Sequence, residues 1–209
     1  MVAGRLRVEI LSGLISPGTR LLQTKLAARM RTSTTPVREA MAELAAEGLV
    51  DLGPHRGVIV HEPNEKELNE VYEMRSLLDP VLIAKTVTNI TESEIERSAA
   101  LCRRMEEETE PGAWVVLNSH FHAHMDGAAR SPLLASTVRN LRNRSSIYIA
   151  ASLRESPERV ADANAEHLAM VEACRRRDVD SGLEPTGRHI KATLELVTVY
   201  LRRLDSKTA

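Results

Sequence analysis

The stretch TPVREAMAELAAEGLV, residues 35–50, has the pattern of an amphipathic helix that ends in a turn and runs on into a strand. Apolar residues recur at intervals of three and four and so share one helical face, at Val37, Ala40, Met41 and Leu44. Pro36 suits the first turn of a helix, and Gly48 suits the position after its end. The pattern predicts a helix with one buried face and a defined end.

The residues on either side of this helix complete a larger motif. Upstream, the spacing of apolar residues predicts a helix that stops at Gly13, a turn at 16–18 and a short helix at about 23–30. Downstream, LVDL and GVIV flank the turn residues GPHR and predict a hairpin. Two helices, a turn, a third helix and a hairpin form a winged helix-turn-helix, which indicates double-stranded DNA as the partner.

In this motif, the second helix lies in the major groove and its N-terminal residues face the base edges. The candidate DNA-contacting residues there are Ser33, Thr34, Thr35 and Arg38. At the tip of the hairpin, His55 and Arg56 lie beside Gly57 and suit a contact with the DNA backbone or minor groove. Taken singly, each of these residues is better explained as a cap or turn residue on a solvated surface. The whole arrangement favours DNA binding.

The remainder of the chain is predicted to be helical throughout. Straight-chain residues dominate and aromatic residues are only 2%, a composition that favours helices over strands. The predicted helices span about 65–87, 91–108, 112–128, 132–153, 157–177 and 185–204, the last after a break from Gly182 to Pro185. The fold class is therefore mainly α, with a DNA-binding domain at 1–62 and a bundle of about six helices at 63–209.

Charge and hydropathy narrow the functional classes. Residues 1–61 carry eight Lys or Arg against five Asp or Glu, whereas residues 62–209 carry twenty against twenty-four. A mildly basic N-terminal part suits a polyanionic partner. Apolar runs all fall short of the length of a membrane span, so the chain is expected to be soluble and cytoplasmic, without a membrane partner. Cys102 and Cys174 are expected to be buried thiols.

The segment LNSHFHAHM, residues 117–125, places three histidines at every second position. Because the surrounding apolar residues follow helical spacing, only side chains four apart can converge. Two pairs remain, Asn118 with His122 or His120 with His124, and the spacing does not choose between them. His167 and His189 lie on later helices, and His167 is in line with apolar residues. Inward imidazoles from three helices suit zinc, nickel or manganese.

Three stretches resemble a known family, and they are PGTRLLQTKLA (17–27), TPVREAMAELAAEGLV (35–50) and HRGVIV (55–60). They resemble the N-terminal domain of the GntR superfamily of bacterial transcription regulators. The helical remainder looks like the FadR-type effector domain, often called FCD. The resemblance implies a homodimeric, ligand-responsive regulator, in its commonest form a repressor, that binds two-fold symmetric operator DNA.

The resemblance also implies a metal site. The FCD motif has an Asp and a His four apart on one helix and one His on each of two later helices. These positions match Asn118, His122, His167 and His189, with an amide where the family has a carboxylate. The amide oxygen can still bind a metal, but it contributes no charge.

The DNA-binding part also departs from the family pattern. Thr34 and Thr24 stand where the family usually has arginines, and both are typical DNA-contacting positions. Lys25 is the first candidate for a replacement charge, together with Arg29 and Arg31. The operator need not therefore be the one common in the family.

Arg75 is the one charged residue within an otherwise apolar helical stripe. A buried charge is costly unless it is paired, so one interpretation is a structural ion pair with a carboxylate of the bundle. The other is a clamp for a small organic acid effector, the role of a matching arginine in FCD proteins. Arg130, Arg142 and Arg144 are further candidates that the sequence does not rank.

A metal-dependent enzyme that uses the histidine cluster is the alternative function. Catalysis there would need an acid or base close to an open metal position. The sequence places no Glu at a matching helical spacing to His122, and this favours a regulator over an enzyme.

Overall fold

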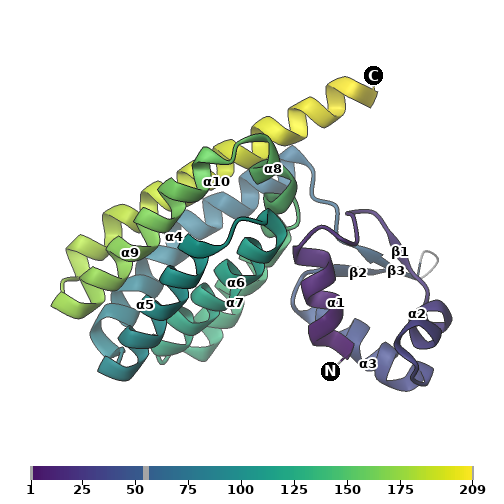
Figure 1. Cartoon of the computed structure of the whole chain (residues 1–209), viewed down its shortest axis with the longest axis horizontal. Helices are drawn as coiled ribbons and strands as arrows, with labels where there is room; N and C mark the ends of the chain where they lie inside the picture. The colour runs from purple at the N-terminus through teal and green to yellow at the C-terminus, as the bar shows by residue number, and fades with distance from the viewer. Residues whose placement is uncertain (1, 54–56, 209) are drawn as a thin grey trace.

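The computed structural model describes residues 2–53 and 57–208, and it is mainly α-helical with one small sheet (Figure 1). The N-terminal part forms the predicted winged helix-turn-helix, so the predicted fold class is confirmed. Its elements are α1 (Val2–Leu11), β1 (Arg20–Leu21), α2 (Gln23–Met30), α3 (Thr34–Ala46), β2 (Val50–Gly53) and β3 (Gly57–Val60).

The sheet has one strand more than the hairpin predicted from the sequence. Its three strands are antiparallel in the order β1-β3-β2, with Leu21 opposite Val58 and Leu52 opposite the same residue on the other side. Strand β1 was missed because two residues are too few to show an alternation of apolar and polar side chains.

Helix α3 forms as its sequence pattern indicates. Its predicted apolar face is buried, and α1 packs against it. Gly48 follows the helix with a φ of 78°, a backbone conformation that other residues rarely adopt. Its amide donates to the carbonyl of Ala45, and the amide of Leu49 donates to that of Leu44. This Schellman arrangement ends α3 and directs the chain into β2.

The rest of the chain forms a helical bundle. Its helices are α4 (Glu65–Asn89), α5 (Glu92–Glu107), α6 (Pro111–Ala128), α7 (Pro132–Ser146), α8 (Ile149–Glu155), α9 (Glu158–Arg176) and α10 (Val179–Thr208). In the described residues, the bundle thus holds seven helices where about six were predicted, because the predicted helix at 132–153 divides into α7 and α8. Within the described helices, none is long and apolar enough to cross a membrane.

The predicted break from Gly182 to Pro185 was wrong, because α10 passes through both residues. Proline at position 185 removes only one backbone hydrogen bond, to the carbonyl four residues earlier. Asp178 caps the start of the helix, since its carboxylate accepts from the backbone amide of Ser181 at 3.1 Å. At Gly182, α10 packs against Ile83 and Val87 of α4. The cap at Asp178 and the packing against α4 together stabilise a continuous helix in spite of Gly182 and Pro185.

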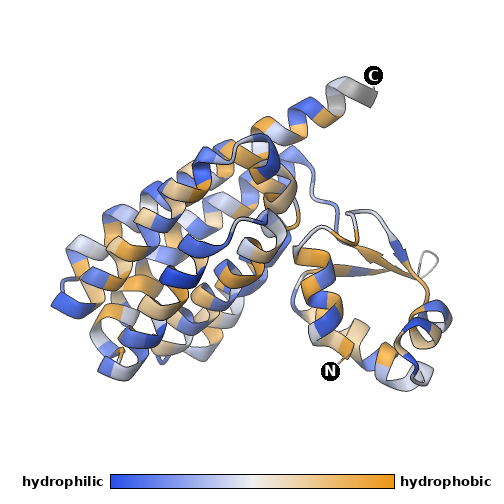
Figure 2. Cartoon of the chain, in the orientation of Figure 1, coloured by the Kyte–Doolittle hydropathy of each residue, from blue (hydrophilic) through white to orange (hydrophobic). Residues whose placement is uncertain are grey.

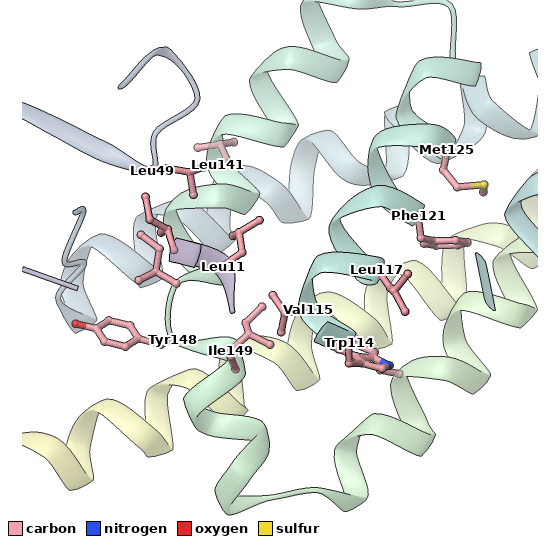
Figure 3. Packing of buried hydrophobic residues seen from close by; sticks show 14 of the residues in the cluster. Leu11, Leu49, Trp114, Val115, Leu117, Phe121, Met125, Leu141, Tyr148 and Ile149 are labelled. Atoms are coloured by element: carbon pink, nitrogen blue, oxygen red, sulfur yellow. The ribbon is translucent and has the colours of Figure 1, made fainter. Parts of the chain in front are cut away.

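The core is continuous from the N-terminal elements into the bundle. Strand β3 is mainly apolar, whereas α9 and α10 alternate apolar and hydrophilic bands (Figure 2). Figure 3 shows Leu11 of α1 near Val115 of α6 and Ile149 of α8, all buried. The predicted stripe on α6 is buried along its whole length, from Trp114 through Phe121 to Ala128. This burial holds the inner face of α6 against the other helices. The polar residues of that face are therefore held there too.

Candidate functional site

Three helices bring three histidines together in the middle of the bundle. His122 comes from α6, His167 from α9 and His189 from α10, and all are at least nine-tenths buried. The centroid of the His167 ring lies 5.1 Å from that of His122 and 4.7 Å from that of His189. One ring nitrogen from each lies within 4.8 Å of the others. The rings therefore converge on one point.

The geometry of α6 separates the two histidine pairs that the sequence left open. Asn118 and His122 are both buried on the inner face of the helix. His120 is exposed, and His124 is half-buried with its Nε2 3.0 Å from the carbonyl oxygen of Glu94. The face with Asn118 and His122 is therefore the one that points into the bundle.

Several polar atoms of this cluster are buried without a hydrogen-bond partner among the described residues. Across residues 2–53 and 57–208, Oδ1 of Asn118, Nε2 of His122 and both ring nitrogens of His167 are buried without a hydrogen-bond partner. Unpartnered buried polar atoms are costly, so a cluster of them points to a missing partner. Three imidazoles and an amide oxygen are a suitable donor set for a divalent transition metal. The ring nitrogens lie up to 4.8 Å apart, so the rings would have to move closer together to form metal–nitrogen bonds of about 2.1 Å.

Burial keeps these imidazoles neutral, which is the form that binds metals. It lowers the pKa of His122 and His167 well below the usual histidine value, and the nearby positive charges of Arg142 and Arg159 act in the same direction. The pKa of His189 is also lowered by burial, although Glu166 opposes the shift. Neutral rings leave a lone pair for a metal at neutral pH.

Glu166 orients His189, a role that the sequence reasoning missed. Oε2 of Glu166 lies 2.8 Å from Nδ1 of His189 and accepts from Nη2 of Arg159 at 2.6 Å. A carboxylate on Nδ1 holds the proton there and leaves Nε2 free to bind a metal. Glu166 directly precedes His167, and its spacing from Arg159 of seven residues was a signal that both share a helical face.

Four buried charges lie beside the histidines and neutralise one another. Nε and Nη2 of Arg75 donate to Oδ2 of Asp79 at 3.2 and 3.0 Å, and Nη1 of Arg142 donates to Oδ2 of Asp126 at 2.6 Å. Asp79 also approaches Arg142, at 4.0 Å. Burial raises the pKa of Asp126 in spite of Arg142. Burial opposes the charge of Arg142, but Asp126 and Asp79 more than offset it and raise its pKa.

The structure shows the partners of the four arginines that the sequence offered as candidate effector contacts. Arg75 has the structural ion pair that was one of its two interpretations, and its guanidinium also lies 4.9 Å from the ring centroid of Tyr72. Arg142 is buried in the bundle, whereas Arg130 is exposed and pairs with Glu94. Arg144 lies outside the network and pairs with Glu67.

A small cavity of about 30 Å³ connects the charge network with the histidines. Arg75, Arg142, His122 and His189 all line it. Apolar residues from α4, α6, α9 and α10 complete its wall, among them Leu82, Phe121, Met170 and Ile190. A mostly apolar pocket with a few convergent charged groups is typical of a site for a small ligand.

The residues predicted to contact DNA lie on the surface of α2 and α3 and between them. Those that the structure describes are all exposed, and they are Lys25, Ser33, Thr34, Thr35 and Arg38. His55 and Arg56 lie outside the described residues. Exposure at the N-terminal end of α3 leaves these side chains free to meet a DNA groove.

Two family models match this chain. The model of the bacterial regulatory proteins of the gntR family matches residues 1–60, and that of the FCD domain matches residues 70–192. The chain belongs to the GntR family and carries an FCD domain. Members of these families are transcription regulators, and not enzymes. GntR-family membership implies DNA binding by the helix-turn-helix, and the FCD domain implies an effector.

Named relatives agree with this assignment. The chain is 26% identical over 199 residues to the Nta operon transcriptional regulator of Aminobacter aminovorans, with 91% of this chain and 94% of the relative covered. It is also 26% identical to the transcriptional repressor RspR of Escherichia coli, with 92% and 85% covered. The solved structure of McbR/YncC of Escherichia coli superposes with a TM-score of 0.81 at 20% identity, over 95% and 96% of the two chains, which shows a shared fold.

Proposed function

We propose that this GntR-family regulator is a homodimeric repressor with a metal-assisted pocket for a small carboxylate. In this proposal, residues 1–62 bind operator DNA and residues 63–209 bind the effector and form the dimer. The observation that carries the proposal is the cluster of unpartnered histidine and asparagine atoms beside a cavity that also contains two arginines.

Asn118, His122, His167 and His189 would hold the metal, which is zinc, nickel or manganese. All four ligands are neutral, so the full charge of the ion would remain to be balanced inside the bundle. When bound, the metal supplies a Lewis acid and a positive charge that attract a carboxylate. Glu166 supports the arrangement by fixing the proton of His189 on Nδ1.

Arg75 and Arg142 extend the positive side of the cavity. Each guanidinium already has an aspartate partner, so the cavity by itself is close to electrically neutral. A bound metal would make it positive, and a small organic anion would then restore neutrality. Arginine suits this role because its planar group can donate two parallel hydrogen bonds to one carboxylate.

An exposed apolar stripe on α4 supports the homodimer. Met74, Leu77 and Val81 recur at three and four residues and are 44%, 69% and 48% exposed. The opposite face of the same helix is buried in the bundle at Leu68, Val71 and Leu82. A helix that is apolar on both sides is normally covered on both sides. A second copy of the chain would cover this stripe, and the two DNA-binding domains would then be related by one two-fold axis.

A thermal-shift titration tests the metal-assisted pocket. Protein freed of metal with a chelator should gain stability with ZnCl2, NiCl2 or MnCl2, and citrate, as a carboxylate probe, should add a further gain only when metal is present. His122→Ala should lose both responses, and the exposed His120→Ala should keep them. A wild-type protein that responds to none of the metals would contradict the proposed site.

DNA binding is tested separately by a gel shift with the DNA upstream of the protein's own gene. We expect one shifted complex of dimer size, with an affinity that falls as salt is raised. Protection of a single half-site by a monomer would contradict the proposed dimer.

A further inference from the structure

Two side chains of α7 hold the C-terminal end of α3, the recognition helix of the DNA-binding domain. Nδ2 of Asn140 donates to the backbone carbonyl of Ala46 at 2.7 Å, and Nδ2 of Asn143 donates to that of Glu47 at 3.0 Å. The last carbonyls of a helix lack partners within the helix and need donors from elsewhere. The bundle therefore supplies part of the cap of the recognition helix.

The contact between α7 and the turn after α3 is also close in space. A Cβ atom on Gly48 would lie 2.6 Å from Oδ1 of Asn140 and 3.2 Å from its backbone oxygen, so only glycine fits there. One turn further along α7, Nη1 of Arg144 donates to Glu67 at 2.8 Å and lies 3.5 Å from Nε2 of His61. A movement of α7 would consequently shift the end of α3 and the segment that connects the two domains.

The same turn of α7 reaches the cavity on its other side. Arg142 lies between Asn140 and Asn143 in sequence, lines the cavity and donates to Asp126 of α6. Helix α6 also joins the two regions, since a Cβ on its Gly112 would lie 2.7 Å from the backbone oxygen of Ser12. That contact is ten residues, about 15 Å, along α6 from His122. In α7 the contact with α3 and the contact with the cavity are adjacent, at Asn140, Arg142 and Asn143.

We propose that Asn140 and Asn143 are positioning residues through which the cavity controls the recognition helix. An anion that engages Arg142 competes with Asp126 for the guanidinium, and the resulting shift of α7 is passed to α3 by the two amides. The part played by the anion rests on the proposed function. Arg142 has two arrangements in this proposal, one paired with Asp126 and one paired with the anion. The link through α7 can change DNA affinity only if the recognition helix is placed differently in these two arrangements.

A double-mutant cycle on the full-length protein tests the link without any ligand. The cavity is perturbed by Asp126→Asn, which weakens the hold on Arg142, and the link is removed by Asn140→Ala with Asn143→Ala. Affinity is measured for a duplex that the wild-type protein selects from a random DNA pool, and hydrogen exchange is followed at residues 44–50. Asn89→Ala is the matched control, because the amide of Asn89 donates to the carbonyls of Lys85 and Ala129 within the bundle.

We expect Asp126→Asn to change DNA affinity about fivefold or more in the wild-type and Asn89→Ala backgrounds. Without Asn140 and Asn143, the same substitution should change it less than twofold, and the change in hydrogen exchange at residues 44–50 should also disappear. If Asp126→Asn does not fold, Arg142→Lys, which keeps the charge, replaces it as the perturbation.

Equal effects of the cavity variant with and without the two asparagines would overturn the proposal. A cavity variant that folds but alters neither DNA affinity nor hydrogen exchange would do the same. A parallel calorimetric titration with NiCl2 alone separates the two proposals. Failure to bind nickel counts against the metal site of the proposed function, while the mutant cycle still decides whether α7 is the link.

Discussion

Replacement of Arg75 by methionine should destabilise the protein far more than the loss of an ordinary ion pair. Arg75 is 2% exposed and its partner Asp79 is 5% exposed, so the variant leaves a carboxylate inside the bundle without its closest cation. Breaking a buried pair by removing one partner typically costs about 3–5 kcal/mol. Arg142, 4.0 Å from Asp79, offsets a part of this cost, which places the expected value near 3 kcal/mol.

Two further variants isolate the buried charge as the cause. Arg75→Met with Asp79→Leu removes both charges, and it should be less destabilised than the single variant because neither ion is then left alone. Arg130→Met removes an exposed arginine that pairs with Glu94, and it should cost no more than about 1 kcal/mol.

The free energy of unfolding is measured from urea titrations followed by circular dichroism, and melting temperature gives an independent value. A cost near 3 kcal/mol corresponds to a fall of about 6–12 °C for a chain of this size. If Arg75→Met costs no more than Arg130→Met, the pair with Asp79 is not a buried structural pair. The same result would favour the other interpretation of Arg75, as a residue kept only for the effector.

Three more predictions concern other parts of the molecule. Arg38→Ala should weaken operator binding and reduce its salt dependence in a filter-binding assay, whereas Arg104→Ala, an exposed change in the bundle, should leave both unchanged. Leu77→Glu places a charge in the exposed stripe of α4 and should give monomers in analytical ultracentrifugation, while the matched change at Leu14, 77% exposed in the DNA-binding domain, should leave dimers intact. Glu94 has its pKa lowered to about 2 by the backbone amide of Thr91 and by Arg130, so its charge stabilises the folded state fully above pH 4.5 and this contribution is lost as the pH falls towards 2. Glu94→Gln should therefore cost about 1 kcal/mol in urea titrations at pH 7 and much less at pH 3, and an equal cost at both would show that the charge is unimportant.

Local patterns were sufficient for most of the fold. The apolar face of α3 and the stripe on α6 are strong because three-and-four spacing is repeated over several turns, and both are buried as predicted. The signals failed where a tertiary contact outweighs a local preference. Pro185 suggested a break, but α10 continues because Asp178 caps its start and α4 packs along it. Strand β1 forms through its pairing with β3, and the sequence of residues 20 and 21 alone does not predict this pairing.

The candidate site could be predicted only in part for a related reason. Helical spacing narrowed the histidines of α6 to two pairs, and the packing of other helices was needed to separate them. The partners of Arg142 and His189 come from residues 16 and 23 positions away, a separation at which single-sequence spacing carries no information. Glu166 and Asp126 therefore entered the site only with the structure.

The most direct test of the metal site is anomalous diffraction at the zinc edge, from crystals of the full chain grown with ZnCl2. One strong peak per chain is predicted, about 2.0–2.1 Å from a ring nitrogen of each of His122, His167 and His189 and within reach of Oδ1 of Asn118. A peak bound instead by His120 and His124, or no peak inside the bundle, would contradict the account.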